Sequence, residues 1–185
     1  NKEGELRMLG LLDEKNQDLV RTFTLNGVEY GFIPNLDKIT YGENADVTRY
    51  ISDYGTMHKA MAVLYRPIIQ KQKDKYLIED YEGSYKYAIE LKQMPIKIVF
   101  GAIVFFLSFN QEIVKRYPEL FVEGGNEGLS AQAGFGRKWG GYSELYTLSQ
   151  GDIQRFNTVA KLSLHQCYTY LAFEKEKIEL EQRLL

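Results

Sequence analysis

The chain of 185 residues has one cysteine, four prolines and one tryptophan, and these scarcities exclude several classes of protein. A single cysteine, Cys167, cannot form a disulfide within the chain, which excludes a disulfide-stapled scaffold and fits a reducing compartment. The first five residues carry mixed charge and lack the apolar core of a signal peptide. We therefore expect no export by that route.

Long apolar runs and a strong net charge are also missing. The strongest apolar run, residues 98–107, is much shorter than the ~20 residues of a membrane-spanning helix, so we expect a buried core segment and no membrane partner. The formal net charge of −2 provides no global basic field for nucleic acid. The local basic candidates are weak: Lys71, Lys73 and Lys75 indicate a solvated turn, and Arg137 and Lys138 lie beside Trp139.

Glycine, in contrast, is concentrated in one place. Residues 124–141 read GGNEGLSAQAGFGRKWGG and hold seven of the 16 glycines. Because glycine loses the most backbone entropy on ordering, such a density indicates a flexible linker or a loop that closely approaches another group. The segment has neither the phosphate-loop nor the dinucleotide-binding spacing, which leaves the linker, used as a hinge, as the favoured interpretation.

Local patterns predict a mainly α, α+β fold. Asn26–Gly27 lies between alternating apolar residues, as in a β-hairpin with a type I′ turn, and residues 76–79 can extend the hairpin into a small antiparallel sheet. Thr40 and Glu43 have the spacing of a capping box that opens a helix. A further helix is expected from Pro95 to about Tyr117, with Gly101 allowing a neighbouring helix to approach.

The C-terminal part is predicted to be a helical arm. Two short helices are expected over residues 142–148 and 153–159, with Asp152 as the N-cap of the second, and a capping box at Ser163 and Gln166 starts a last helix. One apolar stripe along that helix holds Leu164, Tyr168, Leu171, Ile178 and Leu185. Such a helix packs along its own domain or presents its stripe to a partner, and the sequence leaves both open.

These patterns give four expected parts. They are an N-terminal extension (1–20), a hairpin with a helical core domain (21–121), a glycine-rich linker or loop (122–141) and a C-terminal helical region (142–185). The expected partner-binding residues are Phe135, Trp139, Leu164, Tyr168, Leu171 and Ile178. Phe135 and Trp139 anchor the linker either on this chain or on a partner.

The residues give little support for catalysis or for a cofactor. His165 and Cys167 lie two residues apart on a helix with no third ligand nearby in the sequence, so no metal site is expected. Cys167 has no nucleophile motif around it. We expect no enzyme and no cofactor; the enzymatic alternative is a small hydrolytic or modifying site assembled from separated residues such as His58, Asp80 and Glu82.

Several segments resemble poorly characterised proteins of tailed bacteriophages. The N-terminal segments are residues 28–36 (VEYGFIPNL), 40–43 (TYGE) and 61–67 (MAVLYRP). The closing segments, which resemble phage tail-assembly and related virion proteins, are residues 139–142, 145–146, 151–153 and 171–175. The resemblance covers most of the chain, and its motifs are structural.

This resemblance implies a role in virion morphogenesis. The favoured hypothesis is a non-enzymatic protein–protein interaction protein, similar to a tail assembly chaperone, whose partners are phage structural proteins or another copy of itself. The alternative within the same class is a structural component of the virion, in the tail, connector or capsid. The resemblance places the protein in the host cytoplasm during assembly and, for a structural component, in the virion.

Overall fold

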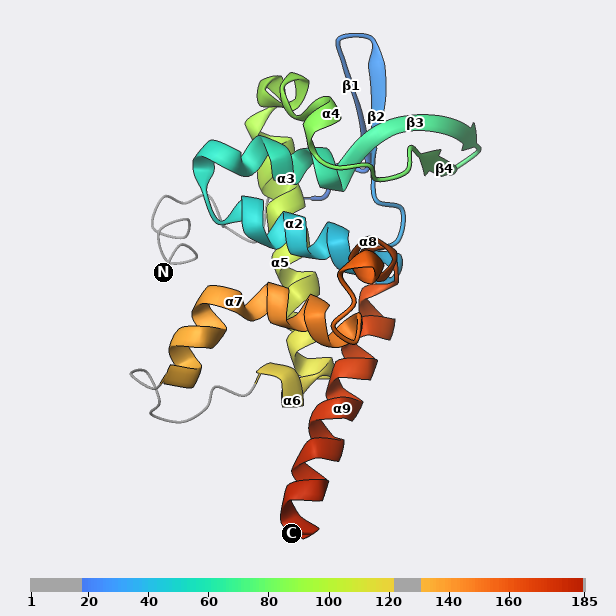
Figure 1. Ribbon diagram of the computed structural model, residues 1–185. Coiled ribbons are helices and arrows are strands. Elements are labelled where there is room, and N and C mark those ends of the chain that lie inside the picture. The colour runs from blue at the N-terminus through green and yellow to red at the C-terminus, as the bar shows by residue number, and fades with distance from the viewer. Residues whose placement is uncertain (1–17, 122–130, 185) are drawn as a thin grey trace. The chain divides into compact units, whose positions relative to one another are not determined.

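A computed structural model describes residues 18–121 and 131–184 of the chain (Figure 1). By their contacts, the described residues divide into two compact units, one of residues 18–36 and 46–110 and the other of residues 37–45, 111–121 and 131–184. This division does not follow the boundaries expected from the sequence, because α2 (Tyr41–Ile51) and α5 (Ile96–Arg116) each contribute residues to both units.

The first unit contains a four-stranded antiparallel sheet in the order β1-β2-β3-β4 (Figure 1). Strands β1 (Thr22–Leu25) and β2 (Val28–Phe32) form the predicted hairpin. Asn26 and Gly27 both have positive φ, 50° and 81°, as a type I′ turn requires. The α+β fold class expected from the sequence is confirmed: a small sheet near the N-terminus combines with helices and a long C-terminal helix.

The other two strands differ in part from the prediction. Strand β4 (Lys75–Ile78) lies where a strand was expected, but β3 (Tyr65–Gln72) begins directly after α3 (Met57–Leu64), and the sequence patterns do not reveal it. Of the three alternating lysines expected in a turn, only Lys73 lies there, with a φ of 53°. In the sequence Pro67 indicates only a helix stop, yet it lies within β3 and its carbonyl accepts a hydrogen bond from the Glu79 N–H at 3.0 Å.

Aromatic rings fill much of the first unit's core. Tyr65 is fully buried, and its ring meets Phe32 and Phe23 edge to face at centroid distances of 5.1 and 5.2 Å. Its hydroxyl donates to the Val20 carbonyl at 2.7 Å, so the buried polar group is satisfied. Burial raises the pKa of Tyr65 above its ordinary value. The central residues of the sheet are thus fixed by packing as well as by strand pairing.

Helix α5 has the expected bounds, but the apolar run of residues 98–107 within it is not buried on every side. Ile103 and Phe106 are buried, whereas Phe105 is 37% exposed. By length and composition alone, α5 meets the criteria for a helix that crosses a membrane, as core helices of soluble proteins also do, and a third of its most apolar window is buried (33%). The segment that approaches Gly101 is the backbone at Asp18, which is neither helix nor strand, where a neighbouring helix was expected.

The second unit is organised around the start of the last helix, α9 (Leu164–Leu184). Both predicted capping boxes are confirmed, Thr40 with Glu43 and Ser163 with Gln166. The two N-cap residues, Thr40 and Ser163, also pair with each other in an antiparallel β-bridge. The bridge is closed by Tyr41 N–H to the Leu162 carbonyl and by Leu164 N–H to the Ile39 carbonyl, both at 2.9 Å.

The glycine-rich stretch differs from its prediction where the structure describes it. Residues 131–141 are part of α7 (Ala131–Leu148), where a linker or loop was expected, and residues 122–130 lie outside the described residues. Glycine is unfavourable in a helix but not forbidden, and a Cβ added at Gly140 or Gly141 would meet no described atom within 4 Å. Asp152 caps the next turn as predicted, by accepting the Gln154 N–H at 2.9 Å.

Two helical glycines give opposite predictions for the same substitution. Gly101→Ala places a Cβ 2.9 Å from the Asp18 carbonyl oxygen, so we expect a loss of about 1–3 kcal/mol in the free energy of unfolding. Gly140→Ala meets no described atom and should gain up to about 1 kcal/mol from helix propensity. Urea unfolding of both variants measures the difference. Equal effects of the two substitutions would contradict this description of α5 and α7.

Candidate functional site

The first half of α9 packs within its own unit. Leu164 is fully buried and Tyr168 nearly so. The Tyr168 ring lies edge to face against Tyr41, Tyr117 and Phe121, at centroid distances of 6.4, 5.6 and 5.8 Å. Two of the expected partner-binding residues, Leu164 and Tyr168, are therefore part of the core of this unit and are not available to a partner. In the sequence, an apolar stripe has the same spacing whether it packs in the core or binds a partner.

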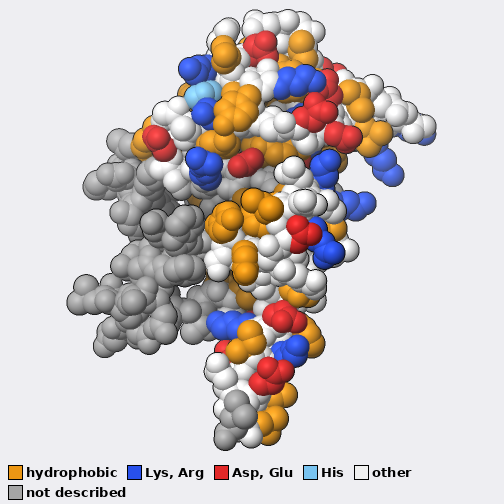
Figure 2. Space-filling view, viewed as in Figure 1, with side chains coloured by type: hydrophobic (Ala, Val, Ile, Leu, Met, Phe, Trp, Pro, Cys, Tyr) orange, Lys and Arg blue, Asp and Glu red, His pale blue; other side chains and the backbone are white. Residues whose placement is uncertain are grey.

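The second half of α9 is exposed. Lys175 donates a hydrogen bond to the Glu119 carbonyl of α6 (Pro118–Phe121), and every described residue after it is exposed. Figure 2 shows hydrophobic, basic and acidic side chains interleaved on this end of the helix. Leu171 is half-buried and Ile178 is 50% exposed, so among the described residues of the predicted stripe these two retain accessible surface, and Leu185 lies outside the described residues.

The exposed half also carries a second apolar face that the predicted stripe does not include. Phe173, Leu180 and Leu184 are 61%, 57% and 79% exposed. They are spaced by seven and four residues, which places them on one side of a helix of 3.6 residues per turn. Ile178 precedes Leu180 by two residues, or about 200° around the helix, so it lies on the opposite side. The spacing of seven and four was the signal that could have identified this face.

The two aromatic residues expected to anchor the linker stay predictions. Phe135 and Trp139 fall on the backbone of α7, and their side chains lie outside the described residues.

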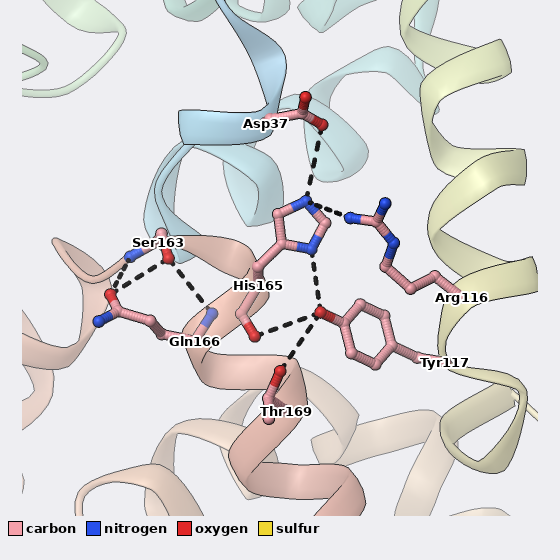
Figure 3. Close-up of polar contacts among 7 residues, drawn as sticks. All are labelled: Asp37, Arg116, Tyr117, Ser163, His165, Gln166 and Thr169. Atoms are coloured by element: carbon pink, nitrogen blue, oxygen red, sulfur yellow. Dashed lines mark hydrogen bonds and ion pairs between the residues drawn. The ribbon is translucent and has the colours of Figure 1, made fainter.

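A polar cluster surrounds the first turn of α9 (Figure 3). Nδ1 of His165 lies 3.0 Å from the Tyr117 hydroxyl, and Nε2 lies 3.3 Å from an Arg116 nitrogen and 3.7 Å from an Asp37 oxygen. The Tyr117 hydroxyl also lies 3.3 Å from the His165 carbonyl and 3.4 Å from the Thr169 hydroxyl. The cluster therefore joins the end of α5 to the beginning of α9.

The hydrogen-bond roles in this cluster follow from its chemistry. A guanidinium can only donate, so a hydrogen bond from Arg116 requires a lone pair on Nε2 of His165. The proton of the neutral ring then lies on Nδ1 and is donated to the Tyr117 oxygen, whose own O–H is free to donate to the His165 carbonyl or to Thr169. These hydrogen bonds therefore hold the first turn of α9 in place.

The candidate nucleophiles point elsewhere. Ser163, which Figure 3 shows beside this cluster, is engaged with Gln166 in the capping box: its Oγ lies 3.1 Å from Gln166 Oε1 and accepts the Gln166 N–H at 3.2 Å. Cys167 is buried, and its thiol faces the Val159 carbonyl at 4.0 Å. Neither residue is hydrogen-bonded to His165 in the part of the chain that the structure describes.

The described structure shows no hydrogen bond or ion pair that joins the residues of the enzymatic alternative. His58 lies on α3, and its pKa is lowered by burial and by the nearby charges of Lys92 and Lys59. Within residues 18–121, the structure shows no hydrogen bond or ion pair from His58 to Asp80 or Glu82, both of which are exposed. Among the described residues, no group of three or more His, Cys, Asp or Glu side chains is arranged to hold a metal ion.

A partly buried hydrogen bond attaches α7 to the rest of its unit. The Tyr41 hydroxyl donates to Glu144 Oε2 of α7 at 2.6 Å. Burial, and then the neighbouring Glu144 carboxylate, raise the pKa values of Tyr41 and Tyr168. The same two causes raise the pKa of Cys167 to about 11. Tyr41, Tyr168 and Cys167 thus share one neighbouring carboxylate, Glu144, which already accepts a hydrogen bond from Tyr41. A buried polar group that is satisfied in this way is typical of a structural contact.

Comparisons with protein-family models, with curated proteins and with solved structures find no match to this chain. The candidate site therefore rests on its own geometry. Its most distinctive feature is an anchored helix whose second half exposes two apolar faces.

The buried thiol gives a direct prediction. Because only the thiolate is reactive and the pKa of Cys167 is raised to about 11, iodoacetamide at pH 8 should label the protein only when it unfolds. Mass spectrometry with and without urea measures this. Lys161→Cys, at an exposed position, provides a reactive reference in the same unit. Equal labelling of Cys167 in both conditions would contradict the packing of α9.

Removing one hydroxyl tests the His165 cluster. Tyr117→Phe leaves His165 Nδ1 without its partner, so we expect a loss of about 1–3 kcal/mol in the free energy of unfolding. Tyr146→Phe, at a tyrosine that is 56% exposed, is the matched control and should change stability by less than about 0.5 kcal/mol. Denaturant titration compares them, and a Tyr117→Phe variant as stable as the control argues against the cluster.

Proposed function

We propose that this protein is a non-enzymatic interaction protein in tailed-phage assembly, with a role similar to that of a tail assembly chaperone. The observation that carries the proposal is the exposed second half of α9, where large apolar side chains alternate with charged ones. The resemblance of several sequence segments to phage tail-assembly proteins supplies the biological setting.

The division of α9 into two halves supports a role in binding. The first half is fixed by the β-bridge at Thr40 and Ser163 and by the aromatic contacts of Tyr168. A helix that is already held at one end loses less conformational entropy when it binds a partner than a segment that must first fold. The exposed half therefore presents a preformed amphipathic surface of the kind that enters a hydrophobic groove.

Ile178 is the residue on which this proposal is tested. It continues the side of α9 that holds Leu171, and it is 50% exposed. Truncation of a buried apolar anchor at the centre of an interface costs about 1.4 kcal/mol, which corresponds to about a tenfold change in affinity.

We predict that Ile178→Ser lowers the capture of phage structural proteins about tenfold. The full chain carrying an affinity tag is recovered from cells producing the phage that encodes it, and the captured proteins are measured by quantitative mass spectrometry. Ile153→Ser removes another exposed isoleucine, 68% exposed, from the same unit and should leave capture unchanged.

The same preparation separates a chaperone from a virion component. A chaperone is found with phage structural proteins in producing cells and is missing from purified particles. Equal capture by the two variants, or capture of no phage structural protein, would refute the proposal. Recovery of the protein in purified particles would assign it to the virion instead.

A further inference from the structure

The second apolar face of α9 has the spacing of a helix-pairing surface. Phe173, Leu180 and Leu184 are all more than half exposed, and Lys177 lies between them on the same side. The steps from Phe173 to Lys177, Leu180 and Leu184 are four, three and four residues, which is the core spacing of a coiled coil. The face is about 16 Å long, from the rise of 1.5 Å per residue.

We propose that this face binds the same face of a second copy of the chain, with the two helices antiparallel. A twofold axis between residues 178 and 179 places Phe173 opposite Leu184 of the second copy and Lys177 opposite Leu180 of the second copy. The aliphatic stem of Lys177 can cover Leu180 while its ammonium group stays in water. Every exposed apolar side chain of the face then has a partner.

Charge favours this orientation. The antiparallel register brings Glu176 beside Arg183 of the second copy, twice by symmetry, and Lys177 near Glu181 of the second copy. Within the described part of the chain Arg183 makes a loose, exposed contact with Glu179, at 3.9 Å, which the new pair can replace. The like-charge approach of Glu174 to Glu181 of the second copy, which also occurs twice by symmetry, opposes the arrangement, and Lys177 lies close enough to offset it.

A parallel pair has the opposite charge pattern. It would set Lys177 directly against Lys177 of the second copy and Glu176 beside Glu181 of the second copy. Like charges at core and flanking positions are destabilising, so the charges that permit the antiparallel pair disfavour the parallel one.

The described surface beside this face is hollowed. The described residues that line the hollow all come from α9: Phe173, Glu176, Lys177, Glu179, Leu180 and Arg183. With three apolar side chains per copy, the interface is smaller than the ~1,200 Å² of a stable complex, so we expect a weak dimer with a dissociation constant on the order of 100 μM. The pairing does not depend on the proposed function, because it requires only the protein itself.

Charge reversal tests the pairing on the full chain. Sedimentation equilibrium over a wide concentration range should show a monomer–dimer equilibrium for the unmodified protein. Arg183→Glu and Glu176→Arg should each weaken the dimer about tenfold, since each sets like charges opposite each other twice. The double variant Glu176→Arg with Arg183→Glu should restore it. Lys161→Glu makes the same change in net charge as Arg183→Glu at an exposed position outside this face and should have no effect.

Cross-linking tests the orientation. Glu176→Cys and Arg183→Cys are placed on separate copies, mixed and oxidised; the buried Cys167 does not compete. An antiparallel pair gives disulfides between unlike copies. The proposal is overturned by a protein that stays monomeric at every concentration, by a double variant no tighter than the single ones, or by disulfides formed only between like copies.

Discussion

The second unit depends on one short contact, the β-bridge between Thr40 and Ser163. Each of these residues caps a helix, and each helix's first N–H bonds to the chain that precedes the other helix. Donors that are usually left unpaired at helix starts are thus satisfied across the bridge. The same approach explains Gly42, where a Cβ would lie 3.0 Å from the Ala160 carbonyl oxygen.

Because the bridge fixes where α9 begins, it also determines which part of the helix is covered. The turns nearest the bridge bury Leu164, Cys167 and Tyr168, and the contacts end at Lys175. From Phe173 onwards the helix has two apolar faces on opposite sides, one at Ile178 and the other at Phe173, Leu180 and Leu184. Opposite faces allow a partner and a second copy to bind the same helix together, so the two proposals are compatible.

The sequence could predict those parts of the fold that depend on residues close together in the chain, namely the hairpin turn and the helix caps. Asn26–Gly27, the two capping boxes and Asp152 act through neighbours within a few residues, and the structure has each of them as expected. Strand β3 was missed because its pairing with β2 and β4 joins residues far apart in sequence. The helical part of the glycine-rich stretch was missed because the contact of Tyr41 with Glu144 of the same helix is also distant in sequence. For the candidate site, periodicity found the stripe of α9, but only packing showed that Leu164 and Tyr168 belong to the core.

Helix α9 is thus one helix with an anchored half and an accessible half, and both proposals depend on this division. Hydrogen–deuterium exchange of the free protein, at a concentration well below that of any dimer, measures it most directly. We predict slow exchange for the amides of residues 167–172 and fast exchange for those of residues 176–184. Uniform protection along the whole helix, or rapid exchange in the half next to the bridge, would contradict this division.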